Sequence, residues 1–135
     1  MPKFISCQRA TSAVEFAMLL PLFIAVVFGI VVFGSYFAVV HGIQQLAAEA
    51  ARSSIAGVND TERGTLANNY INTNVSAYPL INASHLTVSA VPSGTTAFVV
   101  TVNYDASDLY IYKLPSVVKP PSMITRSAVI PFGGF

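Results

Sequence analysis

An unbroken apolar run dominates the first third of the chain. From Phe16 to Val40, 25 consecutive residues carry no charged side chain. At about 1.5 Å of rise per residue, a helix of this length reaches roughly 38 Å, against a hydrocarbon core of about 30 Å. The apolar core of a secretory signal is shorter, about 7–15 residues, and a small-residue cleavage site follows it. The pattern therefore predicts a transmembrane helix over about residues 16–40.

The helical period continues beyond the apolar run. Small and apolar residues recur at intervals of three and four, with mostly polar residues between them. The members of this stripe are Ile43, Leu46, Ala47, Ala50, Ala51, Ser54 and Ile55. Alanine favours helix, and Gly57 is a plausible stop. We expect one helix over residues 11–57, whose amphipathic part packs on this chain's own domain or against another helix.

A second, shorter helix is expected at the start of the remaining chain, residues 58–135. Asn59 or Asp60 is a suitable N-cap, and acidic Glu62 follows in the first turn. Pro79 prevents continuation. These signals predict a helix over about residues 60–76.

The period then changes to two, which is typical of strands. Two alternating runs, residues 85–91 and 97–104, flank a Pro-Ser-Gly-Thr turn and predict a β-hairpin. Residues 123–130 alternate again as a third strand, and residues 109–115 are either a short edge strand or an ordered loop. The predicted fold class is α+β, with helices against one face of an antiparallel sheet of about three to four strands.

Charged residues are rare, and their distribution orients the chain. They make up 10% of the 135 residues. Lys3 and Arg9 precede the apolar run, so the positive-inside rule places residues 1–10 in the cytoplasm and residues 58–135 outside it. Beyond residue 41 the basic and acidic residues balance, so we expect no nucleic-acid partner.

No arrangement of residues predicts catalysis or a cofactor. His41 and His85 each lack a second histidine or cysteine at ligand spacing, so a zinc site is not expected. Asp105 and Asp108 flank Ala-Ser after a strand, where a capped turn is favoured over a cation site. Cys7, the single cysteine, has no internal disulfide partner and is expected to be a reduced thiol. We expect a protein without enzymatic activity, metal or cofactor.

Glu15 places a carboxylate directly before the apolar run. One interpretation is a capping box, in which the Ser12 hydroxyl accepts from the Glu15 N–H and the Glu15 side chain returns to the Ser12 N–H. A carboxylate in the first turn also suits the helix dipole, by about 0.3–1 kcal/mol. Close to the headgroups, such a charge avoids the penalty of about 2.5–3.5 kcal/mol at mid-bilayer.

The second interpretation of Glu15 comes from a resemblance. A basic leader, a small residue, four residues, a glutamate beside the aromatic Phe16 and an apolar helix resemble the class III signal of type IV prepilin-like proteins. Set on that pattern, Ala10 is the last leader residue and Thr11 the first mature residue. The pattern usually has glycine where this chain has Ala10. A protein that keeps residues 1–10 is therefore an alternative.

The apolar helix is also similar to the N-terminal segment of the TadE-like pseudopilins of the tight-adherence (Tad/Flp) pilus system. The similarity rests on Val-Glu-Phe-Ala at residues 14–17, on Pro21 six residues after the glutamate, and on Phe-Gly-Ile at residues 28–30. It covers residues 9–56 and weakens afterwards. A pilin-like fold is what this resemblance implies for the whole chain.

The resemblance implies a structural role in a bacterial inner membrane, crossed once and with the N-terminus in the cytoplasm. A prepilin peptidase would cut after Ala10, and Glu15 would then pair with the N-terminal ammonium of a neighbouring subunit and set its axial register. Independently of the resemblance, Pro21 removes the backbone hydrogen bond to the Ala17 carbonyl, so we expect a kink there. The implied partners are other pilins or pseudopilins of the Tad system, an inner-membrane assembly platform and the lipid bilayer.

The size of the downstream domain suggests which kind of subunit this is. Major pilins of the Tad system have little beyond the helix, whereas this chain carries about 80 further residues. We therefore expect a minor pilin or pseudopilin, which is needed for assembly and is incorporated in an extracellular pilus or kept in the membrane. The alternatives are an unprocessed, membrane-anchored accessory or scaffold protein and an exported ligand-binding domain.

Overall fold

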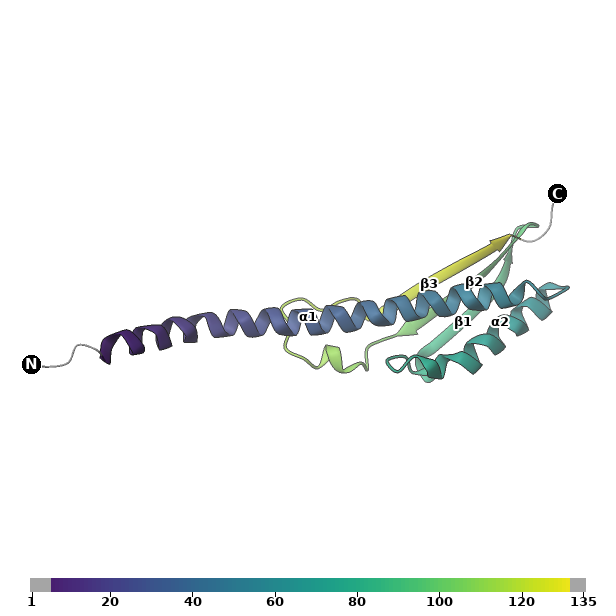
Figure 1. Cartoon of the computed structure of the whole chain (residues 1–135). Helices are drawn as coiled ribbons and strands as arrows, with labels where there is room; N and C mark the ends of the chain where they lie inside the picture. The colour runs from purple at the N-terminus through teal and green to yellow at the C-terminus, as the bar shows by residue number, and fades with distance from the viewer. Residues whose placement is uncertain (1–5, 132–135) are drawn as a thin grey trace, which may run out of the picture.

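One helix runs through the whole length of the molecule. The computed structural model describes residues 6–131, with side chains from residue 11 onward. Helix α1 (Ser6–Ser54) has 49 residues, which corresponds to about 74 Å. Its N-terminal part projects alone, and its C-terminal part lies along a small domain (Figure 1). The α+β fold with a long N-terminal helix is therefore confirmed.

Both ends of α1 differ from the predicted range of residues 11–57. The helix is already formed at Ser6, the first residue that the structure describes, because Cys-Gln-Arg-Ala ahead of Thr11 contains good helix formers and no breaker. It ends at Ser54, where tighter turns replace the α-helical bonds: Ile55 N donates to Arg52 O and Gly57 N donates to Ser54 O, at 3.2 and 3.1 Å. Gly57 thus lies in the turn that follows the helix.

Helix α2 (Asp60–Asn74) begins at a well-formed cap. The Asn59 side chain accepts a hydrogen bond from Glu62 N at 2.9 Å, and the Glu62 carboxylate accepts one from Val58 N at 2.9 Å. The first bond satisfies a backbone donor that a helix N-terminus leaves free, and the second ties the residue before the cap to the first turn. The predicted second helix is confirmed, with Asn59 as its N-cap. A 3-10 turn, η1 (Val75–Ala77), extends it before Pro79.

The sheet has three antiparallel strands in the order β1-β2-β3. They are β1 (Leu86–Ser93), β2 (Ala97–Asp105) and β3 (Met123–Pro131). Gly94, with a φ of 68°, lies in the hairpin turn between β1 and β2, in a backbone region that favours glycine. The hairpin and the third strand are confirmed close to their predicted bounds.

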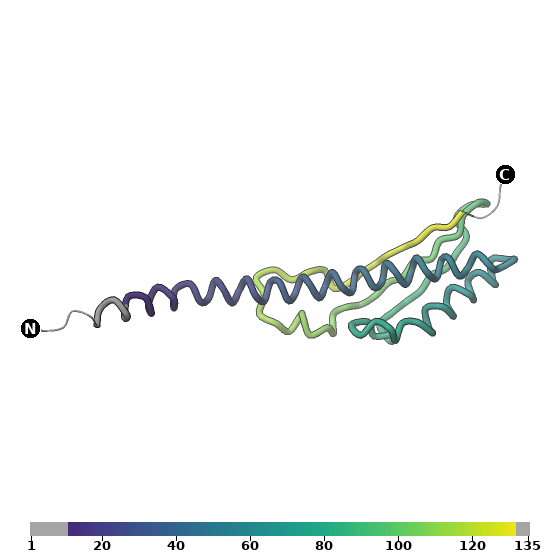
Figure 2. The backbone as a smooth tube through the Cα atoms, viewed as in Figure 1, coloured from purple at the N-terminus to yellow at the C-terminus, as the bar shows by residue number. Residues whose placement is uncertain are grey.

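The segment between β2 and β3 is an ordered loop, so the edge-strand alternative for residues 109–115 was wrong. Its only regular element is a 3-10 turn, η3 (Tyr110–Tyr112). Successive short-range bonds hold it: Tyr112 N donates to Leu109 O and Lys113 N donates to Tyr110 O, at 3.1 and 3.0 Å. These bonds curl the chain where a strand would have to stay extended. In Figure 2 the loop turns back towards the N-terminal part of α1.

The core lies between the helices and one face of the sheet. Alternate residues of the central strand β2 point into it: Phe98, Val100, Val102 and Tyr104. Six of the seven stripe residues of α1 are buried, and Ile55, just past the helix end, is 60% exposed. The alanines of the stripe let the helix approach the domain closely. This part of α1 therefore packs on the chain's own domain.

The turn between α1 and α2 leaves no room for a side chain at Gly57, so we predict that this position requires glycine. A Cβ on Gly57 would lie 2.7 Å from both the backbone N and the Cγ of Arg63, whereas one on Gly64 would meet only Ala90 O, at 3.7 Å. We expect Gly57→Ala to lower the free energy of unfolding by about 1–3 kcal/mol, the usual range for overpacking. The matched change Gly64→Ala should stabilise α2 by up to about 1 kcal/mol.

Thermal unfolding of the detergent-solubilised protein, followed by near-ultraviolet circular dichroism of its tyrosines, measures both effects. If the midpoint for Gly57→Ala equals or exceeds that of the unaltered chain, the turn is less tight than this geometry requires.

Candidate functional site

The N-terminal part of α1 is apolar on every side. All residues from 11 to 27, here called the exposed segment, have exposed side chains. Its large apolar members are Val14, Phe16, Met18, Leu19, Leu20, Leu22, Phe23, Ile24, Val26 and Val27. An 18-residue window of the helix has a mean hydropathy of 2.9 with 6% of its residues buried. In length and composition, this helix fits a single-pass membrane anchor.

The exposed segment contains most of the residues that are predicted to take part in processing and in subunit assembly. Thr11, Glu15 and Phe16 all lie on it with exposed side chains. Ala10 lies within α1, but its side chain is outside the described residues. No described part of the domain packs over Glu15. The carboxylate is therefore accessible to lipid headgroups or to another subunit.

Ser12 is not at the end of the helix in this chain. Because α1 already begins at Ser6, Ser12 lies inside it, where helix backbone N–H groups bond to preceding carbonyls. The capping box of Ser12 and Glu15 is therefore not the N-terminus of this helix. It stays a prediction for a chain that starts at Thr11.

Pro21 lies inside a helix that continues through it. Its predicted kink stays a prediction, but its surroundings are informative. Pro21, Ile24 and Ala25 of α1 line a small hollow together with Pro115, Ser116 and Val117. The loop between β2 and β3 therefore reaches the exposed segment.

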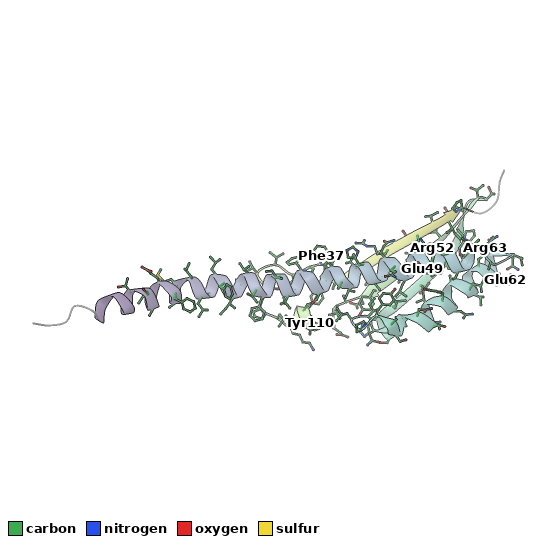
Figure 3. All side chains as sticks on the ribbon, viewed as in Figure 1. Phe37, Glu49, Arg52, Glu62, Arg63 and Tyr110 are labelled. Carbon is green, nitrogen blue, oxygen red and sulfur yellow. The ribbon has the colours of Figure 1, made fainter. Side chains whose placement is uncertain are left out.

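This loop, residues 106–122, is tied to α1 by specific contacts that sequence reasoning missed. Ala106 N donates to Ser122 O at 2.8 Å and closes its base. The hydroxyl groups of Tyr110 and Ser35 share a hydrogen bond of 2.6 Å between loop and helix, and Figure 3 shows Tyr110 beside α1. Ile111 of η3 is 1% exposed and η3 contacts α1.

Further bonds shape the far side of the loop. The Tyr112 hydroxyl donates to Pro121 O at 2.7 Å, and Lys119 Nζ donates to Tyr112 O at 3.1 Å. The aromatic and aliphatic residues in Leu-Tyr-Ile-Tyr (109–112) are the signal in the sequence that this loop packs on something apolar.

The acidic turn after β2 holds its carboxylate through local bonds. Asp105 accepts a hydrogen bond from Ser107 N at 2.9 Å, so the predicted capped turn is confirmed. This N–H and the Ser107 hydroxyl lower the pKa of the Asp105 carboxyl from its ordinary value. Asp108 points elsewhere, with its carboxylate 3.4 Å from His85 Nε2. Within residues 11–131, no three histidine, cysteine or acidic side chains gather as metal ligands.

The His85–Asp108 pair lies at an open depression of about 600 Å³. Apolar residues of the η1–β1 connection and of the loop line most of it, including Leu80, Ile81 and Leu109. The depression holds no cluster of nucleophile and base. Its composition suits contact with an apolar group better than chemistry.

Comparison with known proteins bears on the helix. A family described as TadE-like protein matches residues 10–52, which is nearly all of α1 and neither α2 nor the sheet. No curated protein and no solved structure matches the chain.

The docking of the loop on α1 can be tested by proteolysis. Replacing buried Ile111 with alanine removes packing worth about 2–5 kcal/mol, so we expect the loop to open more often and trypsin to cleave after Lys113 faster. The rate of appearance of the two fragments in detergent measures this. Val118→Ala, at a position 61% exposed, is the control and should leave the rate unchanged. Equal rates for both variants would show that Ile111 does not hold the loop.

Proposed function

Helix α1 is TadE-like over residues 10–52, and from this premise we propose that the chain is a minor pilin or pseudopilin of a Tad pilus. It is a structural subunit without enzymatic activity, inserted in the inner membrane by α1. The observation that carries the proposal is the exposed segment, residues 11–27, whose side chains are exposed all round the helix. The domain reaches it only with the loop between β2 and β3, beside Pro21, Ile24 and Ala25.

The two halves of α1 support this role in different ways. The C-terminal half seals the core of the domain, so it holds the domain rigidly to the helix. The N-terminal half has an apolar surface that only lipid or other apolar helices can cover. A subunit with this shape can rest in a bilayer and then pack helix to helix with other pilins. Its domain stays outside in both situations.

Glu15 is the polar group within that apolar surface. After cleavage behind Ala10, it would lie four residues, or about 6 Å of helical rise, from the Thr11 ammonium of its own chain. In a bundle of such helices, the Thr11 ammonium of a neighbour would pair with the carboxylate. Removing one partner of a buried ion pair costs about 3–5 kcal/mol. Subunits offset along the axis would leave Glu15 unpaired, so the pair favours one register.

One observation favours a second candidate, a scaffold protein that keeps its leader. Helix α1 runs from Ser6 through Ala10 and Thr11 without interruption. A peptidase that cleaves extended chain would have to unwind this part of the helix first. An uncleaved chain would have its N-terminus ahead of the bilayer, and Glu15 would pair with a different group.

The mature N-terminus distinguishes the two candidates. We expect intact-mass spectrometry of the membrane protein, purified from cells that contain the prepilin peptidase, to show a chain of residues 11–135. Cells without the peptidase provide the control and should yield residues 1–135. Ala10→Gly, which restores the usual residue at the cut, should increase the processed fraction. A chain that keeps residues 1–10 in peptidase-containing cells supports the scaffold instead.

Replacing Glu15 with glutamine tests the register role. The amide removes the charge and keeps the size, so we expect fewer pili per cell by electron microscopy at an unchanged membrane level of the protein. Glu49→Gln is the matched control. Its carboxylate forms a surface pair with Arg52 at 2.7 Å, worth about 0–1 kcal/mol, and piliation should not change. Normal piliation in Glu15→Gln would rule out the ion-pair role.

A further inference from the structure

The loop between β2 and β3 carries an apolar tip bracketed by lysines. The loop tip, residues 114–118, reads Leu-Pro-Ser-Val-Val and lies between Lys113 and Lys119. Val117 is 90% exposed and Val118 61% exposed. Two adjacent valines exposed to this degree are costly in water and favourable in lipid. The two lysines would suit anionic phosphate groups.

The position of the loop tip supplies a second, independent observation. Pro115 and Val117 line a hollow with Pro21 and Ala25 of α1, which belong to the exposed segment. The apolar surface of the tip is thus continuous with the apolar surface of the helix. If α1 is inserted in a bilayer, lipid that covers the helix also covers the tip.

Backbone chemistry limits how deep the loop can lie. An irregular loop has peptide groups without partners, and the hydrocarbon core offers them none. Pro115, Pro120 and Pro121 lack an N–H donor, which lowers the number of unpaired groups. A span of residues 16–40 would place Ala25 about 22 Å below the outer edge, past the bilayer centre, and η3 within hydrocarbon. At that depth the unpaired peptide groups of the loop would face hydrocarbon, which is unfavourable.

A shallower position of α1 in the bilayer suits both the helix and the loop between β2 and β3. If the outer edge of the hydrocarbon lies between Ala25 and Ile30, the helix residues beside the loop tip, Pro21 and Ala25, lie at most about 14 and 8 Å inside it. Segments at the interface typically lie roughly 5–10 Å deep. About 20 residues further back, the cytoplasmic edge falls between Ser6 and Thr11. Arg9 provides a positive charge at that edge.

We propose that the loop tip inserts its apolar side chains into the outer lipid leaflet beside α1, with Lys113 and Lys119 at the phosphate groups. In this arrangement the loop sets the depth of α1, and the membrane span is about residues 8–28 instead of 16–40. Tyr110 and Tyr112 then lie near the interface, where tyrosine is favoured. The proposal rests on the membrane insertion of α1 but not on its incorporation in a pilus.

The chain contains no tryptophan, so a single introduced one reports on a single position. Val117→Trp places it on the loop tip. Val58→Trp is the matched control, because Val58 is an equally sized residue, 83% exposed, in the turn between α1 and α2. Leu19→Trp, at a position 62% exposed on α1, reports on insertion of the helix itself.

The full chain is reconstituted in vesicles of phosphatidylcholine and phosphatidylglycerol whose acyl chains carry bromine, a contact quencher of tryptophan. We expect quenching and a blue-shifted emission for Val117→Trp and Leu19→Trp, and neither for Val58→Trp. Bromine near the headgroup should quench Val117→Trp more than bromine at the chain end. Quenching of Leu19→Trp without quenching of Val117→Trp overturns the proposal and leaves the membrane helix intact. Absence of quenching in both overturns the insertion of α1 and the proposal with it.

Discussion

A single helix has to satisfy two different surroundings, and the rest of the structure depends on that constraint. Along its C-terminal half, α1 presents a narrow stripe of small and apolar residues to the sheet and α2 and polar residues to water. Along its N-terminal half it is apolar all round. Because the helix is continuous, the domain cannot move independently of the membrane segment. With the N-terminal half inserted in lipid, as proposed, the depth of the helix decides how far the domain lies from the bilayer.

The loop between β2 and β3 connects these two halves. It leaves the sheet at Ala106, contacts α1 through η3 and reaches Pro21 before returning at Ser122. A loop that lies along an apolar helix restricts how much of the helix lipid can surround. With the proposed shallower span, Glu15 lies about 6–14 Å inside the cytoplasmic edge. A carboxylate at that depth has a stronger need for a partner than one at the headgroups.

Much of the fold follows from local patterns. The strands of the hairpin alternate between core and surface as residues 86–91 predict, and Asn59 caps α2 through bonds to adjacent residues. The stripe of α1 was recognised from its spacing, because residues on one helix face repeat every three to four positions. The spacing does not say what the stripe contacts, since alanines allow the close approach of a sheet and of a second helix equally. In the structure the stripe packs on the chain's own domain.

The sequence by itself determined that a long apolar helix comes first, the pattern of the three strands, the position of Glu15 and the resemblance of the helix to TadE-like proteins. These properties depend on residues close to one another in the chain. Only the tertiary structure decided that residues 109–115 curl into η3 and that the loop tip meets Pro21, about 95 residues earlier in the sequence. Contacts at that separation arise from how the sheet and helix pack. The spacing of apolar residues along the chain does not predict them.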